Sequence, residues 1–165
     1  MLPLNATYFD EITDVQGTNG KLIYYLTLDE NSNYNYLESN ETGNNIISKI
    51  AGNPKIRLLL DAGALMVDLE NKQVVEQWLI LSKENDNIKA GVYFKDNDLF
   101  VVERNGRVTS FELSPYKFQL SECVIYLDDI HTRGTDLKIP KDTIGAVTLG
   151  KGLTKDKLVQ VFFSQ

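Results

Sequence analysis

Residues 55–61, KIRLLLD, decide the fold class, because their four aliphatic residues would face both sides of an extended chain. A run without apolar and polar alternation is typical of a strand that is buried on both faces of a parallel sheet. Residues 122–128 (ECVIYLD) and 145–149 (GAVTL) have the same character. We therefore expect these runs to supply three neighbouring parallel strands, over residues 56–60, 124–127 and 146–149.

Two segments have the periodicity of helices. In residues 71–82, NKQVVEQWLILS, the apolar residues form one helical stripe, and Asn71 is placed to cap the start. A shorter helix is expected from Ile46 to Ala51, where the following Gly and Pro would end it. Buried strands separated by helices predict a doubly wound, mostly parallel α/β sheet.

An inserted β-hairpin is expected near residues 98–113. The strand-like runs 99–104 and 107–113 flank Asn105 and Gly106, a pair that strongly favours a two-residue hairpin turn. Residues 90–94 supply a further strand before the hairpin.

The sequence predicts two parts of unequal character. Residues 1–54 form a poorly defined N-terminal part, with a strand-like run at 21–28 and an Asn-rich loop at 31–45. Residues 55–165 form the α/β segment, and residues 153–163 begin a last helix.

Charge and composition exclude several classes of function. The 165 residues carry 17 Lys and Arg against 23 Asp and Glu, a formal net charge of −6, so general nucleic-acid binding is not expected. Cys123 and His131 are the only residues of their types, so neither an internal disulfide nor a zinc cluster is expected. No signal peptide or long apolar run is visible, and we expect an intracellular, cytoplasmic protein without a membrane span.

Residues 124–140, VIYLDDIHTRGTDLKIP, contain the residues with chemical potential. An apolar strand that ends in acids can hold Mg²⁺ beside a phosphate, which makes Asp128 and Asp129 candidate acids and Asp128 a candidate magnesium ligand. With His131 they form an Asp-Asp-x-His string that resembles the D-E-x-H motif of helicase-type ATPases. The alternative is a strand that ends in a solvated acidic turn.

The next residues, Arg133, Gly134 and Asp136, form an R-G-x-D string similar to one on the second RecA-like lobe of superfamily 2 helicases. Glycine lets the backbone approach closely, and arginine can grip a phosphate or a carboxylate, so the string predicts contact with a nucleotide or a neighbouring lobe. The alternative is a turn held by an Arg–Asp pair. The chain has no phosphate-loop string, which excludes a self-sufficient P-loop ATPase.

Cys123 is not expected to be a protease nucleophile. It begins a buried strand, and at about 3.3 Å per residue that strand separates it from Asp128 by roughly 17 Å. A thiol in the hydrophobic core is the better interpretation.

The chain resembles a family of very large eukaryotic proteins that carry adjoining uncharacterised domains and are labelled ubiquitinyl hydrolase or ubiquitin thioesterase. The two most specific segments, YLDDIHTRGTDLKIP (126–140) and AVTLGKGLTKDKLVQ (146–160), are similar to the family's YLDEAHTRGTDLKLP and AVTLGPxLTKDRLVQ. The resemblance covers roughly residues 55–160, and its weaker parts are RLLLDAGA (57–64), VEQWL (75–79) and Ser114-Pro115.

The resemblance implies a fragment of a much larger protein of the thiol-dependent deubiquitinase family, with a helicase-like second-lobe fold. Its partners would be the remainder of the parent protein and ubiquitin conjugates, and ATP with Mg²⁺ would be cofactors of the full-length parent only. Two departures argue against activity in this chain: Asp129 stands where the family has Glu, and the Arg-rich helix that follows in the family is absent.

Three hypotheses for function follow. The chain is a helicase-like module of a deubiquitinase-family protein without a complete catalytic site, a nucleotide-binding second lobe of an ATPase, or an inert scaffold.

Overall fold

The computed structural model describes residues 35–38, 40–132 and 137–153. The chain divides into two units, Met1–Tyr36 and Leu37–Gln165. The strand expected at 21–28, the helix expected at 153–163 and the residues Arg133, Gly134 and Asp136 lie outside the described residues.

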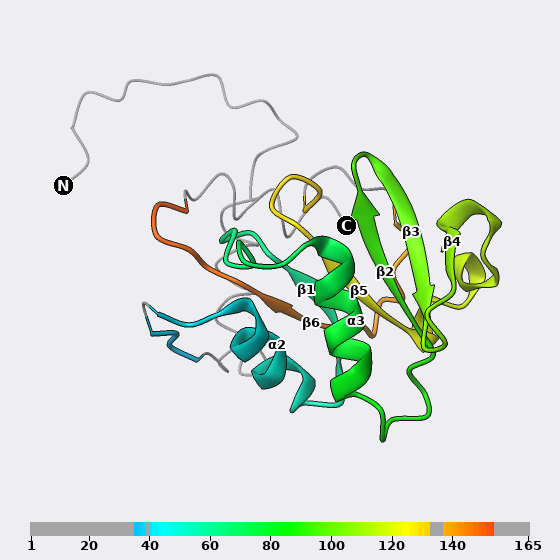
Figure 1. The fold of residues 1–165 in the computed structure, drawn as a ribbon, viewed down its shortest axis with the longest axis horizontal. Helices are drawn as coiled ribbons and strands as arrows, with labels where there is room; N and C mark the ends of the chain where they lie inside the picture. The colour runs from blue at the N-terminus through cyan, green and yellow to red at the C-terminus, as the bar shows by residue number, and fades with distance from the viewer. Residues whose placement is uncertain (1–34, 39, 133–136, 154–165) are drawn as a thin grey trace, which may run out of the picture. The chain divides into compact units, whose positions relative to one another are not determined.

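The second unit contains a mixed six-stranded sheet with the strand order β4-β3-β2-β5-β1-β6 (Figure 1). Four strands, β2, β5, β1 and β6, are parallel, whereas β3 and β4 join the β2 edge in antiparallel fashion. The strands are β1 (Ile56–Leu60), β2 (Ala90–Lys95), β3 (Asp98–Glu103), β4 (Val108–Ser110), β5 (Cys123–Leu127) and β6 (Ile144–Val147).

The expectation of three neighbouring parallel strands is confirmed. Strand β1 lies between β5 and β6, and Leu59 is in register with Tyr126 on one side and Ala146 on the other. The third strand begins and ends two residues earlier than expected, at Ile144 and Val147.

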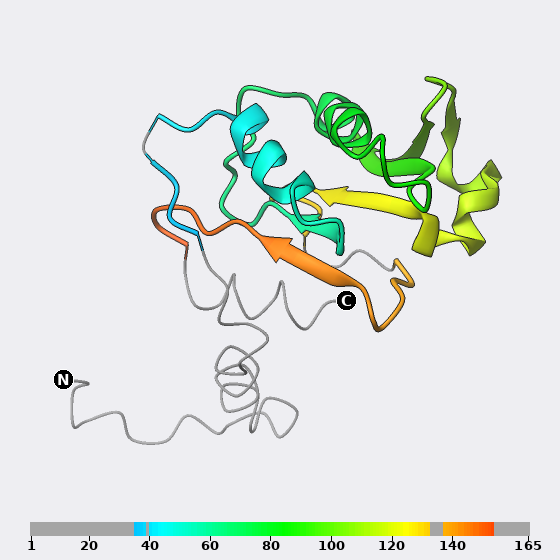
Figure 2. The same cartoon turned by 90° about the horizontal axis from the view of Figure 1, so that it is seen from below.

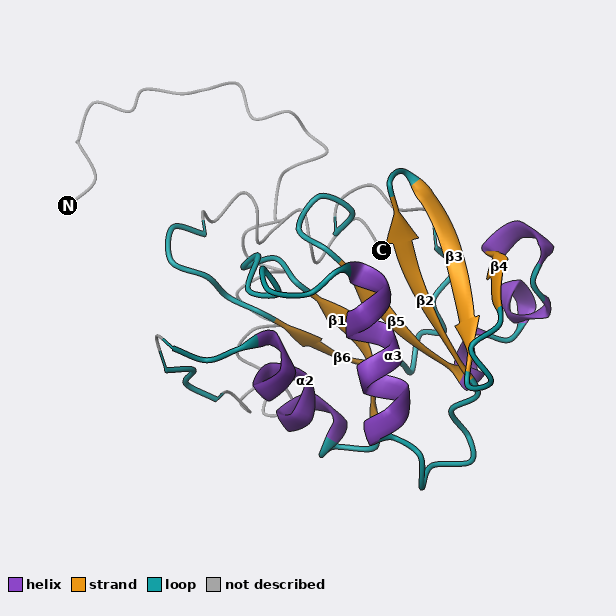
Figure 3. Cartoon of the chain, in the orientation of Figure 1, coloured by secondary structure: helices purple, strands orange, loops and turns teal. Residues whose placement is uncertain are grey.

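The hairpin is also confirmed, but its turn has three residues, 104–106, because the Glu103 N–H donates to the Arg107 carbonyl at 2.9 Å. Gly106 lies in this turn at φ +83°, a conformation that favours glycine. The second strand of the hairpin is shorter than expected and ends at Ser110. A 3₁₀ turn, Phe111–Leu113, stands in place of the rest of that strand, and two more, Pro115–Phe118 and Leu120–Glu122, follow it (Figure 3). The cause is local: Phe111 turns into the core, and the Ser114 hydroxyl accepts a hydrogen bond from the Tyr116 N–H.

Both described α-helices, α2 (Gly43–Ala51) and α3 (Asn71–Leu81), pack on one face of the sheet (Figure 2). The opposite face is covered by Phe111, Leu120 and Leu137, which lie in 3₁₀ turns and a loop. The described residues thus form an α/β fold, but its two α-helices share one face. A doubly wound sheet requires helices on both.

The start of α3 differs from the expectation. Glu70 is the N-cap residue, and its N–H donates to the Gln73 side chain at 2.9 Å. Asn71 is therefore not the cap, and its side chain is directed elsewhere. Among the described residues, no helix is long and apolar enough to cross a membrane.

Candidate functional site

Three parallel strands end side by side in polar residues. Asp61 follows β1, Asp128 follows β5 and Thr148 follows β6. The Asp61 N–H donates to the Leu127 carbonyl and the Thr148 N–H to the Leu60 carbonyl, each at 2.9 Å. Ligands of parallel α/β sheets bind at this carboxyl edge, so it is the candidate functional site.

The Asp61 carboxylate organises the loop after β1. It is 2% exposed and accepts hydrogen bonds from the N–H groups of Leu65 and Met66, at 2.9 and 3.1 Å. It also accepts from the hydroxyls of Thr148, at 2.5 Å, and Tyr126, at 3.3 Å. Burial, reinforced by the Asp61 charge, raises the pKa of Tyr126, so its hydroxyl remains a donor at neutral pH. Four donors surround this carboxylate, so its role is structural.

The carboxylate of Asp128, the first of the expected acids, likewise accepts hydrogen bonds from several protein donors. Its Oδ1 accepts from the N–H groups of Ile130 and His131, at 3.1 and 2.9 Å, and lies 2.7 Å from His131 Nδ1. Its Oδ2 accepts from Asn71 Nδ2 at 2.5 Å. The N–H groups of His131 and Thr132 donate to the Asp128 carbonyl, which closes a single helical turn.

The His131 imidazole joins this turn to the end of β2. It stacks on the Phe94 ring with a centroid distance of 3.9 Å and an interplanar angle of 3°. Asn71 Nδ2 also donates to the Phe94 carbonyl at 2.9 Å. Asp128, His131, Phe94 and Asn71 therefore form one cluster, which we call the Asp128 cluster, from β5, β2 and α3. The side chains of Asp128 and His131 are each only 15% exposed.

Asp129, the second expected acid, lies apart from the cluster. It is exposed, and its carbonyl accepts a hydrogen bond from the Thr132 hydroxyl at 3.1 Å. Both carboxylate oxygens of Asp128 already accept from protein donors, so a magnesium ion held there would share Oδ2 with the Asn71 amide. In the described part of the chain, no three His, Cys, Asp or Glu side chains converge as metal ligands.

The segment with Arg133, Gly134 and Asp136 lies outside the described residues, but its two flanks are buried. Thr132 is 1% exposed on one side, and Leu137 packs into the core on the other.

The glycines of this edge serve close packing of two loops. A Cβ built on Gly63 would lie 2.4 Å from the Gly150 nitrogen, and one on Gly150 would lie 2.4 Å from the Gly63 carbonyl oxygen. The Gly63 N–H donates to the Thr148 hydroxyl at 3.1 Å. This N–H and these glycines therefore hold the β1 and β6 loops together.

Cys123 lies at the other end of β5 and is fully buried. Burial, with a smaller contribution from Glu122, raises the pKa of its thiol to about 12. Its Sγ donates to the Gln119 carbonyl at 3.7 Å. A protonated, enclosed thiol is unsuited to nucleophilic attack, which agrees with the interpretation of Cys123 as a core residue.

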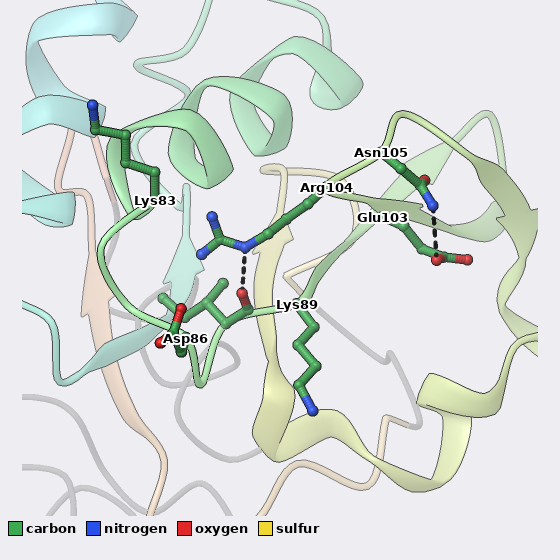
Figure 4. Close-up of a pocket in the computed structure, with 7 residues that line it drawn as sticks. Lys83, Asp86, Lys89, Glu103, Arg104 and Asn105 are labelled. Carbon is green, nitrogen blue, oxygen red and sulfur yellow. Dashed lines mark hydrogen bonds between the residues drawn. The ribbon is translucent and has the colours of Figure 1, made fainter.

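Two hollows lie at the opposite, amino edge of the parallel strands. One, of about 400 Å³, is lined by Lys83, Asp86, Lys89, Glu103 and Arg104 among others (Figure 4). The Arg104 guanidinium crosses it and donates to three main-chain carbonyls, those of Ile88 at 2.6 Å, Ser82 at 2.7 Å and Asn85 at 3.0 Å. The second hollow, of about 560 Å³, lies between the ends of α2 and α3. Neither hollow includes a residue of the Asp128 cluster.

Comparison of the chain with protein-family models, curated proteins and solved structures gives no match in any of the three.

Asn71, Phe94 and Asp61 have no part in the sequence-based site. Of these three residues, Asp61 has a signal in the sequence that could have found it, because it is a lone carboxylate directly after a strand buried on both faces. Asn71 and Phe94 have no comparable signal, because their partners, Asp128 for Asn71 and His131 for Phe94, are distant in the sequence.

Proposed function

We propose that the chain is a non-catalytic α/β module of a larger ubiquitinyl-hydrolase-like protein, with a helicase-like fold and no complete catalytic site of its own. One observation carries this proposal: both oxygens of the Asp128 carboxylate accept hydrogen bonds from the protein itself. A carboxylate used in this way shapes a turn, and it would have to give up or share these hydrogen bonds to serve a reacting group.

The module's role is to hold residues 128–132 in a fixed place for the rest of the parent protein. Three elements converge on the start of this segment, β2 through Phe94, α3 through Asn71 and β5 through Asp128. A segment held by three rigid elements suits contact with a neighbouring lobe, because little conformational entropy remains to be lost on binding. The unpaired thiol of Cys123 is compatible with the cytoplasmic setting that we propose.

A second candidate is the nucleotide-binding second lobe of a superfamily 2-like ATPase. The position of the Asp128 cluster favours it, because nucleotides bind at the carboxyl edge of parallel sheets. In that case Arg133 and Asp136 would contact the nucleotide or the neighbouring lobe, and hydrolysis of ATP with Mg²⁺ would require the parent's other lobe.

The two candidates are separated by activity and binding measurements on the purified chain. We expect no hydrolysis of ATP, no release of a fluorophore from ubiquitin amide and no heat of binding with ATP and Mg²⁺. Turnover of either substrate that is abolished by Asp128→Ala or Cys123→Ser would overturn the non-catalytic proposal. Saturable binding of ATP that Asp129→Ala retains and Arg133→Ala removes would favour the nucleotide-binding lobe.

A further inference from the structure

The carboxyl edge of the sheet presents three exposed aliphatic side chains. Val67 is 87% exposed on the loop after β1, Ile130 is 69% exposed on the turn after β5, and Leu149 is 62% exposed on the loop after β6. The strands before them are adjacent in the order β5-β1-β6 and run in the same direction, as the arrowheads of β5 and β6 show in Figure 2. The three side chains therefore follow one edge, and we call them the edge triad.

Hydrogen bonds fix the loop of each member of the edge triad, and those beside Val67 and Leu149 are buried. The loop with Val67 is anchored by the Met66 N–H, which donates to the buried Asp61 carboxylate. The Ile130 N–H donates to Asp128 at 3.1 Å. Leu149 lies between Thr148, which is bonded to Asp61, and Gly150, whose backbone packs on the β1 loop. Apolar groups held rigidly at a surface lose little entropy when a partner covers them.

Charge is distributed unequally between the two ends of the parallel strands. Among the residues that the structure describes on the loops at the carboxyl edge, the exposed charged ones are five acids and two bases, namely Asp68, Glu70, Asp96, Asp98 and Asp129 against Lys95 and Lys151. At the amino edge and on the described part of the loop that leads into β6 the sign reverses, with seven bases and three acids, namely Lys55, Lys83, Lys89, Arg104, Arg107, Lys138 and Lys141 against Glu84, Asp86 and Asp142. The acidic character is thus local to the carboxyl edge and is not a uniform effect of the net negative charge of the chain.

We propose that the carboxyl edge is a docking surface for a polypeptide segment that presents aliphatic side chains bordered by Lys and Arg. The edge triad supplies the apolar contact, and the surrounding carboxylates select a basic partner and reject an acidic one. The acidic border also disfavours nucleic acids and anionic membranes as occupants. The inference deepens the proposed function, on which it rests, by stating the chemistry of the surface that the module offers.

The test uses the full 165-residue chain and two labelled amphipathic helical peptides of equal length, one of Leu and Lys and one of Leu and Glu. We expect the Leu/Lys peptide to bind in fluorescence anisotropy and to shift the amide NMR signals of residues 67, 130 and 149. Ile130→Ser and Asp129→Lys should each weaken binding about tenfold, a change of about 1.4 kcal/mol. The matched controls, Phe118→Ser and Asp86→Lys, alter an exposed aromatic and an exposed acid elsewhere and should leave affinity unchanged.

Equal binding of the two peptides, binding of neither, or shifts confined to Leu113 and Phe118 would each overturn the docking proposal. If sedimentation velocity shows dimers and Ile130→Ser dissociates them, the surface binds a second copy of the chain. The basic amino edge of that copy would then be the part that contacts it. The proposed function fails by a different readout, the turnover of ATP or ubiquitin amide, so the two can fail separately.

Discussion

Asn71 and Asp128 are joined by a hydrogen bond of 2.5 Å from Nδ2 to Oδ2, which links the first residue of α3 to the residue that follows β5. Asn71 also donates to the Phe94 carbonyl at the end of β2. One amide group therefore ties a helix and two strands together at the carboxyl edge.

Asn71→Ala should lower the free energy of unfolding by about 1–3 kcal/mol, because it leaves the part-buried oxygens of Asp128 and Phe94 without this donor. Asn71→Asp should cost more, since it places a second carboxylate against Asp128. Urea denaturation measures both. Lys72→Ala is the control on the same helix: its ion pair with Glu76 is exposed, and the change should stay within about 0.5 kcal/mol. Equal losses in the two alanine variants would contradict the role of Asn71.

Asp61→Ala should be more damaging than any change to Asp128 or Asp129. It leaves the N–H groups of Leu65 and Met66 and two buried hydroxyls without their acceptor, at about 1–3 kcal/mol for each buried orphan. We expect a total loss of at least about 3 kcal/mol in urea denaturation. Asp129→Ala, at an exposed position, should change stability by less than about 0.5 kcal/mol. A well-folded Asp61→Ala protein of wild-type stability would show that the loop after β1 does not depend on this carboxylate.

The framework of the fold follows from local patterns, and the site follows only partly. The apolar runs at β1 and β5 predict parallel strands because a strand covered on both faces has no polar side to alternate. Asp128 and His131 are found because their string resembles a known motif, yet their roles in the structure come from Asn71 and Phe94. Neither local periodicity nor a short motif contains that long-range information. The same limit explains why Asn71 looked like a helix cap: its type suits a cap, but its amide bonds two residues that only the fold brings near.

The Cys123 thiol should make stability depend on alkaline pH. Its pKa is about 12 in the folded protein and about 8.5 in an unfolded chain, so the folded state holds this proton over the interval in which the unfolded state loses it. The associated stability is complete below about pH 8.5 and decreases as the pH rises toward 12, by up to about 1.4 kcal/mol per unit. Tyr126, whose pKa is also raised, acts in the same direction at higher pH.

Urea denaturation of wild type and Cys123→Ala between pH 8 and 10 tests this expectation, since the variant should have the smaller slope. Alkylation by iodoacetamide at pH 8 gives an independent readout, because the folded protein should react only after unfolding. Rapid alkylation of the native protein would contradict the buried position of the thiol.

Arg104 should stabilise the loop between α3 and β2 more than its exposed position suggests. Its guanidinium donates to the carbonyls of Ser82, Asn85 and Ile88 in a geometry that needs a planar group with several N–H donors. Arg104→Ala should lower the free energy of unfolding by about 1–3 kcal/mol and increase amide hydrogen exchange in residues 82–89. Arg104→Lys should recover little of either, because one ammonium cannot reproduce three separated contacts. The control is Arg107→Ala, which removes an equal charge from the same hairpin and should leave amide exchange in residues 82–89 unchanged. Similar effects in the two alanine variants would mean that charge stabilises the loop, and not the three carbonyl contacts.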